Sequence, residues 1–450
     1  MTQLPPGPTT WKPLGFLGPV RRDVISFLSG VAKEYGDVAA FRVGPMQVVL
    51  LNHPQYINDV LVTGQRNFVK GRPLELAKNL LGEGLLTSDG DVHRRQRRIV
   101  QPAFHREKIE SYGKVMTDYA SRVDRHWRDG GTVDVMQEMM RMALGIAGKT
   151  MLNTDVEADA GRIATAVNAA MSLFDRLSIP LIQVLLRLPL PSSLRFHRAK
   201  RVLDQTIYQI IRERRRSGRD EGDLLSMLIQ LRDEEGDRSR MTDREVRDQS
   251  LIFLLAAYDT TALTLTWTWY LLSQNPDVEK KLHAELAAVL DGRVPGTSDV
   301  PHLKYTYAVF AEAMRLFPPG YVLARRALGD FQVGPYVIPR GATVLVSPYL
   351  IHRDARFYER PEAFCPERWQ CAPQHDQPKF SYFPFGGGAR TCIGESFSWT
   401  EGVLVLATVA QRWTLRLAPD QRVAYLPLLN LRPKYGMRMV LQRRAQGVPE

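Results

Sequence analysis

Residues 385–394 read FGGGARTCIG, in which three consecutive glycines lead through an arginine to a cysteine and a further glycine. The whole sequence has only three cysteines, so the position of Cys392 calls for a chemical reason. Glycine has no Cβ atom, which allows backbone amides to approach a sulfur atom closely. A thiolate in such a loop is suited to act as a nucleophile or as a ligand of a soft metal.

These two kinds of site need different companion residues. A cysteine hydrolase needs a histidine base and an orienting Asn or Asp, and the sequence does not allow either to be assigned. A haem thiolate needs sulfur at the iron, nearby amides that tune it, and cations for the two haem propionates. The other two cysteines, Cys365 and Cys371, flank five residues without a paired CxxC, so we expect them to be structural.

The composition of the chain limits the class of protein. Its 450 residues are 44% hydrophobic and 24% charged, as is typical of a globular protein. An odd number of cysteines in so long a chain excludes a disulfide framework and favours a cytoplasmic location. The net charge of +12 comes without a zinc-finger, helix-turn-helix or aromatic RNA-binding motif. We therefore expect no nucleic-acid partner, whereas an acidic protein partner fits the charge.

One long helix dominates the predicted secondary structure. Thr242 and Glu245 have the spacing of a capping box, and nothing stops the helix before Asn275-Pro276. Its apolar part, residues 251–272, approaches membrane length but holds Asp259 and five threonines. Because an ionisable residue in mid-membrane is costly, we predict a helix buried in a soluble protein and no membrane anchor.

The remaining pattern is helical except near two regions. DVAAFRVGPMQVVLLN (37–52) predicts a β-hairpin around Gly44-Pro45, and strand-like runs recur over 330–348. Apolar residues at three- and four-residue spacing predict further helices, and two charged, glycine-containing segments (214–223 and 232–240) predict surface loops. The expected fold class is mainly α with a small β-rich region.

The middle of the long helix reads AAYDTT (256–261), which places a carboxylate and two hydroxyl groups in apolar surroundings. Buried polar groups are costly unless they have partners, so this cluster suggests a site. The alternative is structural: the threonines bond back to carbonyls one turn earlier, and Asp259 pairs with a basic side chain. The residues alone leave both interpretations open.

The glycine-rich segment resembles the haem-ligand signature of the cytochromes P-450, F-x-x-G-x-x-x-C-x-G. Phe385, Gly388, Cys392 and Gly394 match each of its fixed positions. The resemblance implies that Cys392 is the axial ligand of the iron of haem b, and that Phe385 and Gly394 belong to the loop that binds the cofactor. It also implies one haem domain over residues 1–450, with the long helix above the haem.

Two further motifs occur in the order of that family. Glu312-Ala-Met-Arg315 supplies its E-x-x-R motif, which alone is an ordinary helical pair. Together with Arg368 of the later segment PERW, the resemblance implies a structural triad of Glu312, Arg315 and Arg368. AAYDTT resembles the family's [A/G]-G-x-[D/E]-T-[T/S], so Asp259 and Thr260 become the acid and alcohol of a proton relay. Ala257 departs from the usual glycine, and we expect it to narrow the pocket.

The resemblance also implies which residues contact the haem propionates and the substrate. His93 and Arg97 lie four residues apart on one predicted helical face, and Arg325 and Arg390 stand where the family has basic propionate ligands. The implied pocket is formed by segments 74–86, 171–181, 253–260 and 320–324. The pocket residues are expected to be Phe253, Ala256, Ala257, Val322 and Leu323.

The function implied by this resemblance is monooxygenation. One atom of dioxygen is inserted into a hydrophobic organic substrate, by hydroxylation or epoxidation, in secondary metabolism. Electrons come from a ferredoxin or flavodoxin with its reductase, which docks near Arg94, Arg95 and Arg98. A peroxygenase or isomerase on the same fold, or a non-enzymatic haem-binding protein, remains an alternative.

Overall fold

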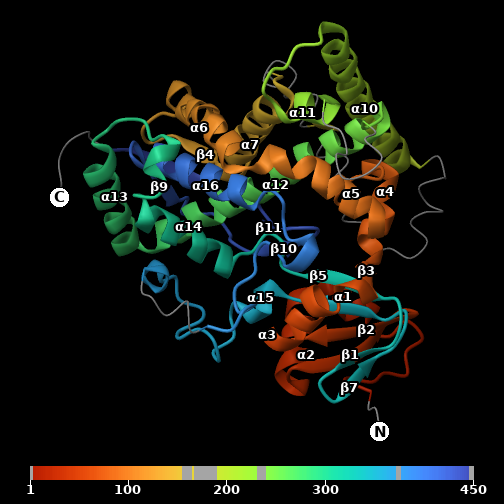
Figure 1. Ribbon diagram of the computed structural model, residues 1–450. Coiled ribbons are helices and arrows are strands. Elements are labelled where there is room, and N and C mark those ends of the chain that lie inside the picture. Colours follow the sequence, from red (N-terminus) through yellow and green to blue (C-terminus); the bar gives the residue numbers. More distant parts are fainter. Residues whose placement is uncertain (1–3, 155–164, 167–189, 231–239, 371–376, 445–450) are drawn as a thin grey trace.

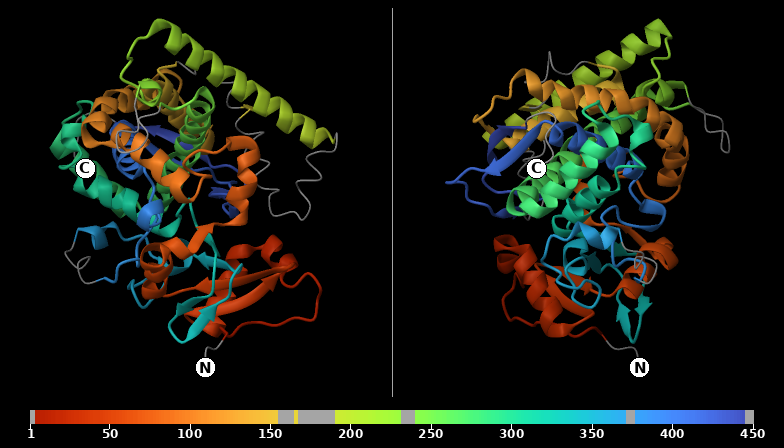
Figure 2. Two further views of the ribbon diagram at one scale, coloured as in Figure 1. Left: turned by 45° about the vertical axis from the view of Figure 1, so that its right-hand side comes forward. Right: turned by 90° about the vertical axis from the view of Figure 1, so that its left-hand side faces the viewer.

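The computed structural model describes residues 4–154, 165–166, 190–230, 240–370 and 377–444 (Figure 1). Most of the molecule is helical, and a smaller β-rich part lies at the end that carries the N-terminus. The two further views in Figure 2 show the same division. The predicted class, mainly α with a small β-rich region, is confirmed.

The β-rich part is built on a five-stranded sheet. Its order is β1-β2-β8-β5-β3, in which only the β2–β8 pairing is parallel. The five strands have the following bounds: β1 Val38–Val43, β2 Met46–Leu51, β3 Phe68–Lys70, β5 Leu323–Ala327 and β8 Thr343–Val346. β1 and β2 form the hairpin predicted around Gly44, whose φ of 58° suits glycine at this turn.

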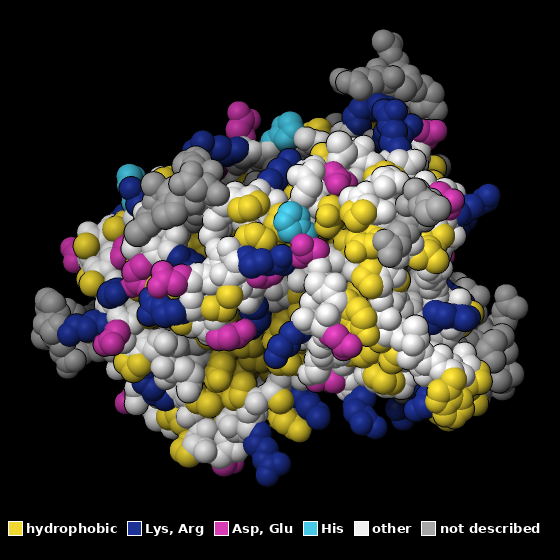
Figure 3. All heavy atoms as spheres, turned by 90° about the horizontal axis from the view of Figure 1, so that it is seen from below, with side chains coloured by type: hydrophobic (Ala, Val, Ile, Leu, Met, Phe, Trp, Pro, Cys, Tyr) yellow, Lys and Arg dark blue, Asp and Glu magenta, His cyan; other side chains and the backbone are white. Residues whose placement is uncertain are grey.

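Short helices cover this sheet. Leu28 and Val31 of one of them pack with Phe41 and Val48 of the hairpin in a separate apolar cluster. The helices of this part are α1 Leu17–Arg22, α2 Val24–Tyr35, α3 Pro54–Asn58 and α15 Pro348–Ile351. Figure 3 views the molecule from this side, where basic and acidic side chains are interspersed, so this face carries no field of one sign.

The larger part consists of helices arranged around one long helix. These helices are α4 Arg72–Leu81, α5 Gly90–Val100, α6 Arg106–Ser121, α7 Val135–Leu152, α10 Pro191–Ser217, α11 Leu224–Gln230, α12 Asp243–Gln274, α13 Pro276–Leu290, α14 Lys304–Leu316 and α16 Glu395–Ala410. α12 begins at the predicted capping box, where the Glu245 amide donates to Thr242 Oγ1 at 3.3 Å and Glu245 Oε2 accepts from the Thr242 amide at 2.8 Å. It ends just before Pro276, as predicted.

α12 is the central element of the large core. It contacts α7, α10, α14 and α16, and Trp267 and Trp269 on it are 1% exposed. By length and composition it could cross a membrane, yet 83% of its most apolar window is buried inside the protein. Its apolar character is therefore accounted for by packing within the protein.

The remaining strands form three small sheets, of which the β6–β7 sheet packs with the β-rich part. β4 Thr132–Asp134, β12 Arg438–Arg443 and β9 Trp413–Leu417 form one, β6 Phe331–Val333 and β7 Tyr336–Ile338 the second, and β10 Tyr425–Pro427 and β11 Leu431–Pro433 the third. The third sheet is an antiparallel hairpin, which we call the C-terminal hairpin (residues 425–433). It contributes to the site described below.

The surface loop predicted over 214–223 is found from Gly218 onward, whereas its first four residues belong to α10. α10 continues through Ser217 and ends at Gly218, whose φ is 61°, so the basic run of this segment is the last turn of a helix. Arg214 pairs with Asp223 at 2.6 Å, which ties the segment to the core. Most of the second predicted loop, 232–240, lies outside the described residues, as does Cys371.

Candidate functional site

The loop that carries Cys392 is closed on itself and packed against the β-rich part. The Cys392 amide donates to the Phe385 carbonyl at 2.9 Å, just before α16. Gly388 has a φ of 69°, and a Cβ there would lie 1.9 Å from the Leu61 carbonyl oxygen. Close packing against the protein's own backbone therefore requires glycine at this position. The Phe385 ring lies 5.7 Å from that of Trp399.

The Cys392 thiol is accessible although the loop runs through the interior. The Gly394 amide donates a hydrogen bond to the sulfur, and Arg97 lies close enough to interact with it. The protein around Cys392 nevertheless limits the hydration of a thiolate at this position. This desolvation raises the pKa of the Cys392 thiol to about 11. A metal ion would displace the proton, because a coordinating thiol is deprotonated.

α12 presents an accessible strip in an otherwise buried stretch. Ala256 is exposed, and Ala257 and Thr260 are half-buried, whereas Leu255 and Tyr258 are 6% and 2% exposed. Positions i, i+1 and i+4 share one side of a helix, so the accessible residues form one surface. Val322 and Leu323, at the start of β5, are also half-buried.

Two contacts place α12 next to the cysteine loop. Phe104 lies 5.3 Å from Phe253 of α12, and its ring edge would be 3.9 Å from a Cβ at Gly394. Thr261 and Ser398 hydroxyls are 3.3 Å apart, which links α12 to the first turns of α16. Phe253 was expected to line the substrate pocket. In the structure it is only 5% exposed, and its ring packs on Phe104. Segment 171–181, also expected in the pocket, lies outside the described residues.

Asp259 and Thr260 make the contacts that the structural interpretation required. The Thr260 hydroxyl donates to the Ala256 carbonyl at 2.9 Å. Asp259 is 1% exposed, and its carboxylate accepts from Asn430 Nδ2 at 2.7 Å and from Arg432 Nη2 at 3.0 and 3.2 Å. The sequence gave little indication of this pairing, because Asp259 and Arg432 lie 173 positions apart in the chain.

The predicted structural triad is present: Arg368 approaches Glu312 and Arg315, which lie on the buried side of α14. Both Glu312 and Arg315 are completely buried, and two bonds join them, at 2.9 and 2.8 Å. Arg368 Nε donates to Glu312 Oε1 at 2.9 Å, and the Trp369 indole donates to Oε2 at 2.8 Å. The remaining Arg315 donors bond to backbone carbonyls, so this buried ion pair is fully partnered.

The four predicted propionate ligands gather from three elements. His93 and Arg97 come from α5, Arg325 from β5 and Arg390 from the cysteine loop. Arg97 Nη1 donates to the Thr391 carbonyl at 2.7 Å, beside Cys392. Arg390 already has protein partners, because Nη2 donates to Asp89 at 2.7 Å and to the Phe68 carbonyl at 3.0 Å. Asp89 immediately precedes α5. It lies close to Arg390 because this end of α5 is next to β3, where the Lys70 amide donates to Asp89 at 3.2 Å.

A further cation, Lys70, was missed from the sequence. It is 5% exposed, and its ammonium donates to the carbonyls of Leu85 and Ser88 at 2.7 and 2.6 Å. The sequence did contain an indication: Phe68 and Lys70 are two positions apart in a short strand, so their side chains lie on the same, buried face. A lysine on the buried face of a strand is unusual enough to indicate a role.

The electrostatics of this cluster show an excess of buried positive charge. Burial, followed by the positive charges of Lys70 and Arg390, lowers the pKa of His93 to about 4. Burial and the neighbouring Arg390 lower the pKa of Arg325 to about 10. Burial lowers the pKa of Lys70 to about 7, although Asp89 opposes this change.

These observations fit haem b. Asp89 is the acidic side chain that interacts with this cluster, so two propionate carboxylates would balance the remaining positive charge. Within the described ranges, no group of three or more His, Cys, Asp and Glu side chains could hold a metal ion. A metal on Cys392 would therefore take its other ligands from a macrocycle, as iron does in haem.

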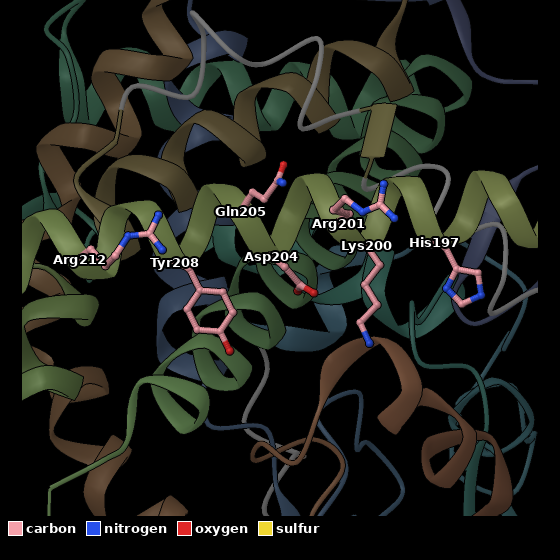
Figure 4. Close-up of a pocket in the computed structure, with 7 residues that line it drawn as sticks. All are labelled: His197, Lys200, Arg201, Asp204, Gln205, Tyr208 and Arg212. Carbon is pink, nitrogen blue, oxygen red and sulfur yellow. The ribbon is translucent and has the colours of Figure 1, made fainter.

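A surface cavity of the described chain lies elsewhere. It has a volume of about 420 Å³ and follows one side of α10 (Figure 4). Its lining is mainly polar and includes Lys200, Arg201 and Asp204, with the Lys200 ammonium bonded to the Asn79 carbonyl at 2.6 Å. No residue predicted for the haem or substrate site lines it, so it is separate from the site around Cys392.

Comparisons with known proteins agree with this geometry. Residues 5–435 match the family described as cytochrome P-450. The chain is 38% identical to cyclooctatin synthase of Streptomyces melanosporofaciens, over 91% of this chain and 89% of that protein. It is 36% identical to cyclooctat-9-en-7-ol 5-monooxygenase of the same organism, over 90% and 88% of the two chains. Pentalenene oxygenase of Streptomyces avermitilis is 33% identical over 96% of both.

A solved structure supports the fold. A cyanobacterial CYP120A1 with bound retinoic acid superposes with a TM-score of 0.89, over 99% of this chain and all of that one, at 24% sequence identity. This likeness shows that the two chains share one fold. The protein is therefore a haem-thiolate monooxygenase that belongs to the cytochrome P-450 family.

Proposed function

We propose that this monooxygenase hydroxylates or epoxidises a terpenoid skeleton. Three relatives that match over most of the chain are named as a cyclooctatin synthase, a cyclooctat-9-en-7-ol 5-monooxygenase and a pentalenene oxygenase. Apart from Thr260, the accessible side chains of the α12 strip are apolar, namely Ala256 and Ala257, and the half-buried Leu323 lies next to the cysteine loop at Gly386. The observation that carries the proposal is this apolar strip near an accessible thiol, since it suits a hydrocarbon without charged groups.

In this proposal the chain binds and orients the cofactor and the substrate. When bound, haem b would supply oxygen activation, which a thiolate ligand favours. Cys392 would bind its iron, and the Gly394 amide would tune the sulfur. His93, Arg97, Arg325 and Arg390 would hold the propionates, His93 as a neutral hydrogen-bond donor, and Lys70 lies beside them as a further basic group. Phe385 and Gly394 complete the loop around the ligand.

We assign the delivery of protons to Asp259 and Thr260. Thr260 lies on the accessible strip of α12, and its hydroxyl already donates one bond to the Ala256 carbonyl. A hydroxyl that donates one bond can still accept another, so Thr260 is able to pass on a proton from a neighbouring acid. Asp259, one residue earlier, is the acid available to it.

The proposed electron donor is a ferredoxin or flavodoxin with its reductase, which docks at α5. Arg94 on this helix is exposed and pairs with Asp91, which is more exposed still. Arg95 is a poorer probe than the sequence suggested, since it pairs with Glu245 at 2.8 Å and is half-buried. Reversing the charge of Arg94 should therefore slow reduction by an acidic donor at low salt, and the effect should shrink as salt is added. Equal rates for Arg94→Glu and the unmodified protein at low salt would contradict this docking surface.

We place the protein in the cytoplasm without a membrane anchor. Among the described residues, α12 is the helix long and apolar enough to span a membrane, and burial in the core accounts for its composition. Recovery of the haem protein in the fraction that remains after membranes are removed would support this location, and recovery with the membranes would contradict it.

The substrate class is tested by a panel of terpenoid, fatty acid, macrolide and steroid compounds. Terpenoids should shift the ferric haem to high spin, and they should be converted to hydroxylated or epoxidised products with NADPH and a ferredoxin system. The reduced protein with carbon monoxide should show the red-shifted Soret band of a thiolate ligand, and Cys392→His should lose it. Conversion with peroxide alone, without turnover by the reductase system, would favour the peroxygenase alternative.

A further inference from the structure

The Asp259 carboxylate is held by a segment distant in the sequence. Asn430 donates to Oδ2 at 2.7 Å, and Arg432 Nη2 lies 3.0 Å from Oδ1 and 3.2 Å from Oδ2. Both residues belong to the C-terminal hairpin. The side chain of Asp259 is 1% exposed and that of Arg432 is 21% exposed, so the ion pair lies largely within the protein. The hairpin therefore sets the orientation of a buried carboxylate.

This orientation points the acid toward the hairpin. The hydroxyl of Thr260 donates to the Ala256 carbonyl, and the oxygens of Asp259 are engaged by Asn430 and Arg432. A proton that passes from Asp259 to Thr260, directly or through water, has to leave a carboxylate whose two oxygens are both held by hairpin side chains. The geometry of the hairpin side chains thus controls a step that is assigned to α12.

The hairpin is fixed in place by bonds on two sides. The Trp267 indole of α12 donates to the Leu431 carbonyl at 3.0 Å, and the Leu431 amide donates to the Pro319 carbonyl at 3.0 Å. The Tyr321 hydroxyl donates to the Leu428 carbonyl at 2.9 Å. Residues 319–321 lead directly into Val322 and Leu323. The hairpin therefore joins the helix that carries Asp259 to the proposed wall of the substrate pocket.

We propose that Asn430 and Arg432 are positioning residues for the oxidation, which act by orienting Asp259 for proton transfer through Thr260. This inference rests on the proposed roles of Asp259 and Thr260. When its partners are removed, a buried carboxylate is no longer compensated for the loss of its hydration. Its side chain is then expected to turn away from its present orientation. Without Arg432, proton delivery is expected to be less efficient. More of the electrons from NADPH would then reduce dioxygen to hydrogen peroxide, and fewer would be used to form oxidised product.

A double-mutant cycle tests this assignment, with product formed per NADPH consumed as the readout. Arg432→Met should lower this ratio about three- to ten-fold, within the range of couplings between contacting residues. Adding Arg432→Met to Asp259→Asn should lower it no further, because the arginine acts through the carboxylate. Arg432→Lys should restore at least half of the ratio, since it returns a cation, and Asn430→Ala should have a smaller effect than Arg432→Met.

The chain offers a matched control in another Arg–Asp pair. Arg438 and Asp420 form an ion pair whose side chains are 48% and 74% exposed. Arg438→Met should leave the product ratio unchanged. A second measurement, urea unfolding of the same variants, does not depend on turnover: the coupling between Asp259 and Arg432 should exceed that between Asp420 and Arg438.

The outcomes separate this inference from the proposed function. Additive effects of Arg432→Met and Asp259→Asn on the product ratio would overturn it. So would an unchanged ratio in Arg432→Met, or a coupling in unfolding no larger than that of the exposed pair. If terpenoids are not converted but another compound of the panel is, the proposed substrate class fails, and the same cycle is read with that compound.

Discussion

At the scale of a single residue, Glu401 shows how the core changes an acid. It lies on α16, is 1% exposed, and its Oε2 has no hydrogen-bond partner. Burial raises the pKa of Glu401 to about 8, although a bond with Thr261 opposes the change. The carboxyl group is thus neutral in the folded protein under conditions in which it is ionised in the unfolded chain.

This difference predicts a pH dependence. Because the folded pKa is the higher one, the folded state binds more protons than the unfolded state between about pH 4.5 and 8, and stability from this group is lost as pH rises through that window. Glu401→Gln should remove the loss, so the free energy of unfolding of the variant should gain on that of the unmodified protein by about 1 kcal/mol per pH unit. Urea unfolding at pH 5, 6, 7 and 8 measures the gain, and parallel curves would contradict it.

At the scale of elements, α14 and α16 approach so closely that one position between them requires glycine. A Cβ at Gly402 would lie 2.2 Å from the ring of Phe310, which is completely buried. Gly402→Ala should therefore destabilise the protein by about 1–3 kcal/mol, as overpacking usually does. Gly30 in α2 is the matched control: it has no atom within 4 Å of the added Cβ, and Gly30→Ala should stabilise by about 0.5–1 kcal/mol. Unfolding free energies of both variants decide this, and equal changes would contradict it.

The buried ion pair of α14 belongs to the same scale. Glu312 accepts bonds from Arg315, Arg368, Trp369 and the Cys365 amide. Replacing it with Gln leaves Arg315 buried without a counter-charge, which should cost about 3–5 kcal/mol of unfolding free energy.

The control for Glu312→Gln is Glu75→Gln. Glu75 pairs with Arg326, and both side chains are 41% exposed. The loss there should be at most about 1 kcal/mol. Chemical denaturation with the haem content measured alongside compares the two variants, and similar losses would show that the buried pair is not special.

At the scale of the whole molecule, buried histidines define the acid limit of stability. Burial lowers the pKa of His283 to about 3, and burial with the nearby Arg315 lowers that of the completely buried His352 well below its usual range. The unfolded chain protonates these rings below about pH 6.5 while the folded protein does not, so stability falls as pH drops below that value, by up to about 1.4 kcal/mol per unit for each ring.

His283→Gln should reduce this slope. His352 accepts from the Phe383 amide at 2.9 Å, so His283 is the safer site for the experiment. Thermal or urea unfolding between pH 4.5 and 7 measures the slope, and the exposed His105 serves as the control, with no change expected in His105→Gln. An unaltered slope in His283→Gln would contradict the assignment.

Local chemistry explains what could be predicted from the sequence. The capping box at Thr242, the helix end before Pro276 and the hairpin turn at Gly44 depend on a few neighbouring residues, and all three were located correctly. The same is true of the motif around Cys392, whose glycines and cysteine lie within ten residues. The loop predicted over 214–223 is present from Gly218, but its start was placed too early, because α10 continues to Ser217 and charged residues are compatible with an exposed helical turn.

The sequence by itself thus determined the fold class, the family motif, and the candidate ligand, acid and alcohol. Only the tertiary structure decided which charges meet: Asp259 with Arg432 across 173 positions of the chain, Arg390 with Asp89, and Lys70 with the cations around the cysteine loop. The physical reason is that an ion pair needs two side chains within about 4 Å. That distance is set by how helices and strands dock, and the spacing of charges along the chain does not contain it.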